Sequence, residues 1–285
     1  MTTRTAPASF SAPAASSHRP DIRLVVTDMD GTLLDAEGRV PQGLWPLLAD
    51  LRSRGVVFSP ASGRQYATLA HLFAGEDDGM VYIAENGAFV VRDGAEISSD
   101  PLDPAVTDRL VKSVRQLVDE GVDAGVVLCG KHAAYTERDD RPFLDEVARY
   151  YHAHRMVDDV TAVDDEIVKV AVFDFGPVER RTAPALASFA HTHQVVVSGE
   201  HWVDVMNRGT DKGVAVRRLQ ERLNIGPAQT MVFGDYLNDL GMLDAADWSY
   251  AMANAHPDVV LRARHMAPAH TEDGVVRTIR SVLGI

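Results

Sequence analysis

Polar side chains follow three short, apolar segments of the sequence, at the point where each segment ends. They are Asp28, Asp30, Gly31 and Thr32 after the first segment, Ser62, Gly63 and Arg64 after the second, and Gly234, Asp235, Asn238 and Asp239 after a late one. If these segments are parallel strands, their carboxyl ends meet at one edge of a sheet, where α/β proteins bind their ligands. The sequence therefore predicts that at least four carboxylates share one site.

Carboxylates that are brought together in this way repel one another unless a cation joins them. Mg²⁺ suits a set of oxygen ligands that contains no His or Cys. Because Mg²⁺ usually keeps waters and binds substrate phosphate, phosphoryl transfer is the predicted chemistry. In such a reaction Asp28 can attack phosphorus as the nucleophile. Asp30 can protonate the leaving oxygen and then deprotonate the attacking water.

Phosphoryl transfer also needs a hydroxyl and a cation near the equatorial oxygens of the phosphoryl group. Ser62 can supply the hydroxyl, and Lys212 can supply the cation. We expect Lys212 in the first turn of a helix that Thr210 caps, where the helix dipole disfavours a positive charge until a phosphate binds. The chain carries 28 Lys and Arg against 41 Asp and Glu, a net charge of −13. A phosphate site must therefore bring its own local positive charge.

The composition also limits the partners. A strongly negative chain is not expected to bind nucleic acid or anionic membranes. No apolar stretch approaches the roughly 18 to 20 residues of a membrane span. The single cysteine, Cys129, excludes an internal disulfide and a cysteine zinc cluster, and it fits the cytoplasm, where we expect the protein. Residues 1–20, rich in Ala, Ser, Thr and Pro, are expected to be a disordered tail, and the oligomeric state stays open.

Strand and helix patterns alternate at both ends of the sequence. Strands are expected at 22–27, 56–58, 80–84 and 230–233, and helices at 42–54, 65–74, 211–223, 237–244 and 272–283. This alternation predicts an α/β core with a doubly wound parallel sheet and right-handed crossovers.

The middle of the sequence has a different pattern. It indicates helices at 104–119 and 141–154 and another ending near 191, with strands at 122–129, 133–137, 167–175, 194–197 and 202–206. We therefore expect a core formed by residues 21–88 and 199–285, interrupted at 89–198 by an inserted α+β domain with an open sheet.

These motifs resemble, in their order, those of the haloacid dehalogenase superfamily, and specifically its Cof-type sugar-phosphatase branch with a large cap domain. They are Asp28-Met29-Asp30-Gly31-Thr32-Leu33-Leu34, Ala61-Ser62-Gly63-Arg64, Ala84-Glu85-Asn86-Gly87-Ala88, Gly209-Thr210-Asp211-Lys212-Gly213, Gly234-Asp235-Tyr236-Leu237-Asn238-Asp239 and Met252-Ala253-Asn254-Ala255. The resemblance covers about residues 22 to 285. It implies a core of the family's fold and a cap at 89–198 that reads the leaving group.

The resemblance also implies a role for each matching residue. The implied roles are nucleophile and metal ligand for Asp28, acid and base with its carbonyl on the metal for Asp30, phosphate binding for Ser62, Gly63 and Lys212, Mg²⁺ binding for Asp235, and support of substrate or metal for Asn238 and Asp239. Tyr236 stands where this branch often carries a smaller residue, which puts the specificity in doubt but leaves every expected ligand in place.

The predicted function is hydrolysis of a small phosphorylated metabolite, such as a sugar phosphate, through an aspartyl-phosphate. A sugar phosphomutase would use the same residues and is the nearest alternative. A receiver-like signalling module, which also phosphorylates an aspartate beside Mg²⁺, is an alternative of a different class. Asp30 and the insertion of about 100 residues argue against it. A catalytically silent binding protein is disfavoured by the complete set of candidate ligands.

Overall fold

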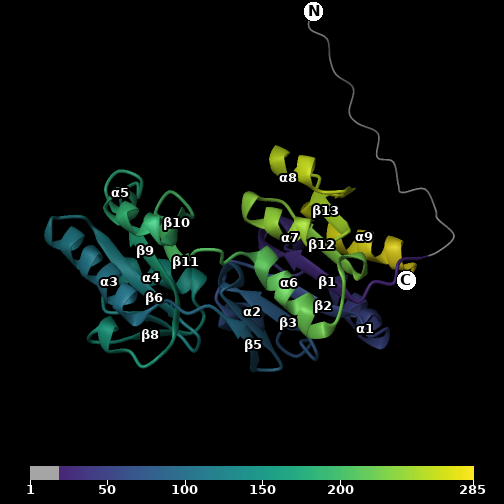
Figure 1. The fold of residues 1–285 in the computed structure, drawn as a ribbon, viewed down its shortest axis with the longest axis horizontal. Helices are drawn as coiled ribbons and strands as arrows, with labels where there is room; N and C mark the ends of the chain where they lie inside the picture. The colour runs from purple at the N-terminus through teal and green to yellow at the C-terminus, as the bar shows by residue number, and fades with distance from the viewer. Residues whose placement is uncertain (1–18) are drawn as a thin grey trace, which may run out of the picture.

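The computed structural model describes residues 19–285, which form two lobes that lie side by side (Figure 1). One lobe contains an eight-stranded sheet and the other a six-stranded sheet. The expected disordered tail, residues 1–20, lies outside the described residues except for Arg19 and Pro20. Within residues 19–285, no helix has both the length and the apolar character needed to cross a membrane.

The larger sheet forms the centre of the first lobe, which we call the core. Its strands, in spatial order, are β14 (His265–Ala267), β13 (Trp248–Met252), β12 (Thr230–Gly234), β1 (Leu24–Asp28), β2 (Val57–Ala61), β3 (Val81–Ala84), β4 (Phe89–Arg92) and β5 (Ala95–Ser99). The six strands from β14 to β3 are parallel, and β4 and β5 add an antiparallel edge. The predicted α/β fold with a parallel sheet is thus confirmed.

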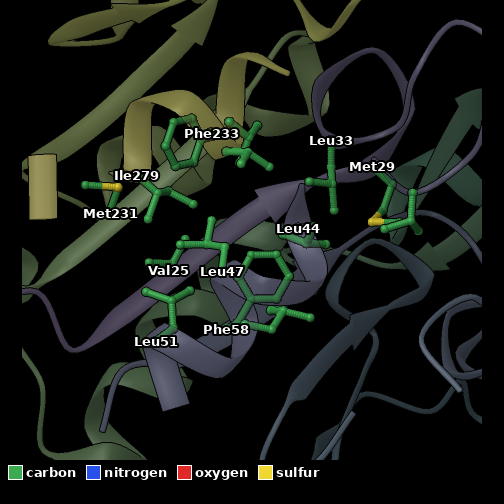
Figure 2. Close-up of a cluster of buried hydrophobic side chains, with 14 of the residues drawn as sticks. Val25, Met29, Leu33, Leu44, Leu47, Leu51, Phe58, Met231, Phe233 and Ile279 are labelled. Atoms are coloured by element: carbon green, nitrogen blue, oxygen red, sulfur yellow. The ribbon is translucent and has the colours of Figure 1, made fainter. Parts of the chain in front are cut away.

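Helices cover both faces of the core sheet. They are α1 (Leu44–Ser53), α2 (Tyr66–Leu72), α6 (Lys212–Leu223), α7 (Leu240–Asp244), α8 (Pro257–Arg262) and α9 (Gly274–Leu283). Successive residues of a strand point to opposite faces, so Val25 of β1 packs with Leu47 of α1 and Ile279 of α9, as Figure 2 shows. Val26 faces the other way and packs in the cluster that includes α6, α7 and α8. The central strands are therefore buried on both faces, which explains why they read as continuous apolar runs.

The second lobe, which we call the cap, has its own sheet and its own apolar clusters. The strands, in spatial order, are β10 (His193–Val197), β11 (Trp202–Asn207), β9 (Ile167–Asp174), β6 (Ala124–Gly130), β7 (Ala134–Thr136) and β8 (His154–Met156). Helices α3 (Pro104–Asp119) and α5 (Thr182–Leu186) contribute to the cluster on one face of this sheet, and α4 (Arg141–Tyr150) packs on the other. The helix pattern in the sequence at 104–119 predicted α3 with the same bounds that the structure has.

The sheets divide the chain at different residues from those expected. The expected insertion at 89–198 would place residues 89–99 in the cap, but β4 and β5 pair onto β3 of the core sheet. It would also place 202–207 in the core, but β11 pairs with β9 and β10 of the cap sheet. The local pattern of a strand does not say which sheet it pairs with, so it cannot assign these segments to one lobe. Similarly, residue 154, expected to end the helix at 141–154, is instead the first residue of β8, which pairs with β7.

The chain crosses between the lobes twice, between β5 and α3 and between β11 and α6. Asn207 in the second crossing donates hydrogen bonds to the Asp100 carboxylate and to the Pro101 carbonyl of the first, both at 3.0 Å. The Thr210 hydroxyl donates to the same carboxylate. These hydrogen bonds join the two crossings, and the last of them, from Thr210, lies two residues before the first residue of α6.

Candidate active site

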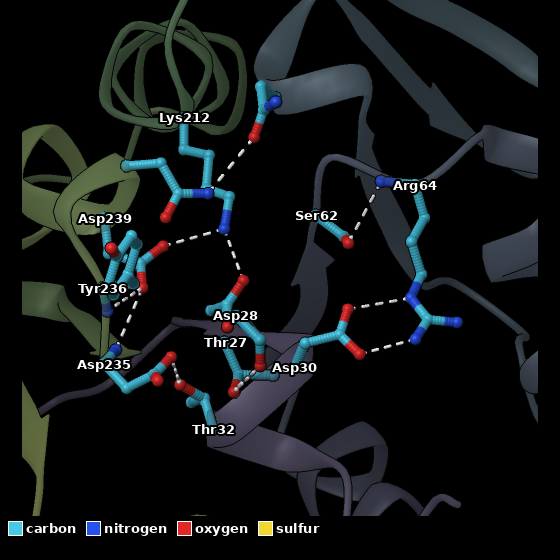
Figure 3. Close-up of polar contacts among 12 residues, drawn as sticks. Thr27, Asp28, Asp30, Thr32, Ser62, Arg64, Lys212, Asp235, Tyr236 and Asp239 are labelled. Atoms are coloured by element: carbon cyan, nitrogen blue, oxygen red, sulfur yellow. Dashed lines mark hydrogen bonds and ion pairs between the residues drawn. The ribbon is translucent and has the colours of Figure 1, made fainter. Parts of the chain in front are cut away.

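The candidate site lies at the carboxyl ends of β1 and β12, which are neighbouring parallel strands. Thr27 pairs with Phe233 in the ladder, so Asp28 and Asp235 leave the sheet side by side (Figure 3). Asp239 follows in the short turn after β12. Asp28, Asp235 and Asp239 each offer one carboxylate oxygen, and these three oxygens lie within 4.8 Å of one another. The structure therefore brings these three carboxylates together at one edge of the sheet, as the sequence predicts.

Lys212, the first residue of α6, inserts its ammonium group between these carboxylates. Its side chain is fully buried and donates hydrogen bonds to Asp28 and, at 2.8 Å, to Asp239. Helix α6 can bring Lys212 this close because Gly213 lies directly against the backbone of Gly241, where any Cβ would collide. The sequence therefore needs a glycine after this lysine.

The residue that caps the N-terminus of helix α6 differs from the expected one. Asp211, not Thr210, accepts a hydrogen bond from the backbone N–H of Val214 at 2.8 Å. The hydroxyl of Thr210 is directed instead toward Asp100, in the crossing between the lobes. An aspartate cap places an additional negative charge at the end of the helix where the ammonium of Lys212 begins, which favours that cation.

The three carboxylates and the single ammonium leave the cluster with an excess of negative charge. Burial raises the pKa of Asp28 well above its usual range, and the neighbouring Asp239 raises it further. Burial also raises the pKa of Asp235. Burial alone would lower the pKa of Lys212, but Asp239 and Asp28 outweigh it and raise this pKa. A divalent cation bound here would compensate the carboxylates, and the all-oxygen donor set fits a hard ion such as Mg²⁺.

Asp30 is held apart from this cluster by Arg64. Its carboxylate receives hydrogen bonds from Nε of Arg64 at 2.9 Å and from a terminal nitrogen at 2.5 Å, and its side chain is 59% exposed. This two-point ion pair raises the pKa of Arg64. Arg64 follows β2, the strand beside β1, so sequence reasoning placed it near the site but gave it no role.

The remaining predicted phosphate ligands lie around a pocket of about 540 Å³ between the core and the cap. Ser62, Gly63, Asn238 and Asp30 all line it. The Ser62 hydroxyl accepts a hydrogen bond from the backbone N–H of Arg64 at 3.2 Å, and the Asn238 side chain donates to Asn86 at 3.3 Å. Lys212 and the three clustered carboxylates do not line this pocket, although Asp28 is only two residues from Asp30, which does.

Three further contacts fix the turn after β1. Gly31 has a left-handed backbone with φ of 79°, and a Cβ there would collide with the Asp235 carboxylate. Thr32 donates a hydrogen bond to that carboxylate at 2.9 Å. Asn254 donates to the Gly31 carbonyl at 2.8 Å and accepts from His270 N–H at 3.1 Å. Asn254 therefore connects the turn to the segment before α9.

Comparison with known proteins assigns the family. Residues 25–279 match the model of the haloacid dehalogenase-like hydrolases. The 5-amino-6-(5-phospho-D-ribitylamino)uracil phosphatase YbjI of Escherichia coli is 30% identical over 265 residues, which cover 92% of this chain and 96% of the relative. The HMP-PP phosphatase of Citrobacter koseri is 25% identical over 255 residues, 86% of this chain and 89% of the relative.

A solved structure supports the same fold. The crystal structure of TM0651 from Thermotoga maritima superposes with a TM-score of 0.80 at 23% identity, covering 91% of this chain and 97% of that one. The sequence motifs, the fold and the relatives thus agree. The chain belongs to the haloacid dehalogenase-like hydrolase family, in its Cof-type branch, and is a phosphatase.

Proposed function

We propose that this phosphatase is Mg²⁺-dependent and hydrolyses small phosphorylated metabolites, sugar phosphates among them, in the cytoplasm. The observation that carries the proposal is the grouping of Asp28, Asp235 and Asp239, two of them bound to the Lys212 ammonium, beside Asp30 and the pocket of metabolite size that Asp30 lines. The names of the relatives, which are phosphatases of a phosphorylated ribitylaminouracil and of HMP-PP, support a small phosphorylated substrate.

In the proposed reaction, a carboxylate oxygen of Asp28 attacks phosphorus and the bond from phosphorus to the ester oxygen breaks. Asp30 donates a proton to the departing oxygen. Asp30 then takes a proton from water, whose oxygen attacks the aspartyl-phosphate and restores the Asp28 carboxylate. Because both oxygens of Asp30 are bound to Arg64 here, we infer that the acid step requires this ion pair to open on the substrate side.

The other residues bind and orient. Lys212 and the Ser62 hydroxyl donate to the phosphoryl oxygens, and Gly63 and Asn238 border the same space. Asp28, Asp235 and the backbone carbonyl of Asp30 would hold Mg²⁺, which supplies charge neutralisation on the phosphoryl oxygens when bound.

Asp239 has a second task in this proposal beside its place among the predicted metal ligands. Its two carboxylate oxygens already accept hydrogen bonds, one from Lys212 and the other from the backbone amides of Asp235 and Tyr236 at 3.0 and 3.2 Å. Asp239 therefore positions both the ammonium group and the turn that carries Asp235.

The test is phosphate release from a panel of sugar phosphates and p-nitrophenyl phosphate, with Mg²⁺ or with EDTA. We expect release that EDTA abolishes and that Mg²⁺ restores. Asp28→Asn should remove it while the thermal midpoint stays close to that of the wild type. Asp119→Asn, an equal change at an exposed position of the cap helix α3, should leave release intact. Full activity of Asp28→Asn would refute the proposal. Isomer formation without free phosphate would indicate a mutase instead.

A further inference from the structure

The turn after β3 holds three consecutive residues in the left-handed region of backbone conformation. Glu85, Asn86 and Gly87 have φ of 49°, 54° and 98°. Glycine takes such angles freely, but for other residues they are uncommon and cost energy. Strain of this kind persists where the surrounding structure enforces it, and it is concentrated at functional sites. The contacts that enforce this turn therefore bear on its function.

The first set of contacts joins the turn to the loop that follows β2. The backbone N–H of Asn86 donates a hydrogen bond to the Ser62 carbonyl at 2.9 Å. The backbone N–H of Glu85 donates to the Arg64 carbonyl at 3.0 Å. Between these two bonds the side-chain amide of Asn86 lies against Gly63, where a Cβ would come within 3.0 Å of its Nδ2. The turn therefore fixes the loop that carries the proposed phosphate ligands Ser62 and Gly63.

The second set of contacts joins the same turn to the loops that follow β12 and precede α6. Nδ2 of Asn238 donates a hydrogen bond to Oδ1 of Asn86 at 3.3 Å. A Cβ on Gly87 would lie 2.5 Å from the carbonyl oxygen of Asp211, the residue directly before Lys212. An amide that donates to a fixed acceptor is restricted in the direction of its oxygen and its remaining N–H. Asn86 therefore orients Asn238 at the edge of the pocket that both residues line.

The cap contacts the turn through Lys169 on β9. Its ammonium lies 2.6 Å from the Glu85 carboxylate, 3.4 Å from the Gly63 carbonyl and 3.7 Å from Asp204 of β11. Lys169 and Asp204 belong to the cap side of the pocket between the lobes. The turn is thus held both from the core and from the cap, and these contacts offset the strain of its backbone.

We propose that Asn86 is a positioning residue of the reaction site. Its side chain orients the amide of Asn238, and its backbone holds the loop of Ser62, so that groups from two separate loops face one phosphoryl group. Asparagine suits this position because it adopts the left-handed region more readily than most residues that carry a Cβ. The inference rests on the proposed phosphatase function and adds a residue that the proposed reaction does not otherwise use.

Replacement of Asn86 by glycine removes the side-chain amide while the left-handed turn is retained. Asn86→Gly should lower kcat/KM for p-nitrophenyl phosphate about tenfold, as expected for the loss of one hydrogen bond that orients a group at the site. Asn224→Gly is the matched control, because Asn224 has the same φ of 54°, follows the end of α6, is exposed and does not line the pocket. It should leave kcat/KM unchanged. Full activity of Asn86→Gly would overturn the inference.

A double-mutant cycle tests whether the Asn86 side chain acts through Asn238. In an Asn238→Ala background, Asn86→Gly should lower kcat/KM by less than about twofold, because the amide that it orients is gone. Additive losses would overturn the positioning role and leave the phosphatase function intact.

The side-chain amide resonance of Asn238 in a nitrogen–proton correlation spectrum gives a readout that does not depend on turnover. This resonance should shift in Asn86→Gly and stay in place in Asn224→Gly. An unshifted resonance in Asn86→Gly would contradict the contact and the inference with it. A shifted resonance in a protein that releases no phosphate would support the contact and count against the proposed function alone.

Discussion

The ion pair between Lys169 of the cap and Glu85 of the core offers a quantitative test of how the two lobes are held. The charged atoms are 2.6 Å apart, and the two side chains are 4% and 2% exposed. Lys169→Met keeps most of the side-chain volume but leaves Glu85 buried without its cation. Breaking a buried pair in this way typically costs about 3 to 5 kcal/mol of unfolding free energy.

The expected cost has a ceiling, because Glu85 can take up a proton. The pKa of an exposed glutamate is about 4.3, and each pH unit above that value adds about 1.4 kcal/mol to the cost of protonating it. Protonation therefore limits the contribution of Glu85 to about 4 kcal/mol at pH 7 and to about 1 kcal/mol at pH 5. Burial already raises the pKa of Glu85 in the folded protein. The variant should accordingly lose stability as the pH rises from about 4.3 through that raised pKa, and level off above it.

The assay is urea unfolding followed by tryptophan fluorescence at pH 5 and pH 7. The double variant Glu85→Gln with Lys169→Met should recover most of the loss, because it leaves no unpaired charge at Glu85. Arg262→Met is the control, since it breaks an exposed ion pair with Asp244 and should cost under about 1 kcal/mol. If Lys169→Met is no more destabilising than Arg262→Met, or if its cost is the same at both pH values, the reasoning from burial is wrong.

Two further predictions test the site from other sides. Gly31→Ala should reduce phosphate release strongly, because the new methyl group would displace the Asp235 carboxylate. Gly38→Ala should lower only the free energy of unfolding, by the cost of a left-handed backbone, about 1 to 2 kcal/mol. This is because Gly38 has φ of 73° but open space around it. Equal activity of the two variants would contradict this. By NMR titration, the pKa of His201 should exceed about 6.5, because the Gly176 and Asp174 carbonyls face its ring; a value below that would contradict the contact.

The sequence was most informative where chemistry follows directly from a strand end. Asp28 and Asp235 are some 200 residues apart, yet each comes directly after a buried strand, and parallel neighbours bring such positions together. Lys212 could be placed near them because it begins a helix that follows a turn motif. These predictions rest on local patterns, each of which fixes both an element and the residue at its end.

The cap side of the pocket could not be predicted in the same way. Lys169 is a charged residue inside β9, which is otherwise apolar up to Asp174 at its end, and Asp204 is the one charged residue of β11. Their significance comes from the pairing of β9 with β11 and from Glu85 in the other lobe, and neither appears in a local pattern. The antiparallel strands β4 and β5 were misplaced for the same reason. A strand's own residues do not determine which sheet it joins.

Some of the contacts between the lobes fall on a loop that borders the reaction site. Gln65 directly follows the loop of Ser62 and Arg64, and its side chain exchanges two hydrogen bonds with the backbone of Ala153 in the cap, at 3.0 and 3.1 Å. Lys169 contacts the carbonyl of Gly63 in the same loop. Because these contacts share one short loop, a displacement of the cap must alter the loop that borders the phosphate. A change in the position of the cap should therefore change the geometry of the reaction site as well. For this reason, substitutions at Lys169 are expected to affect both stability and turnover.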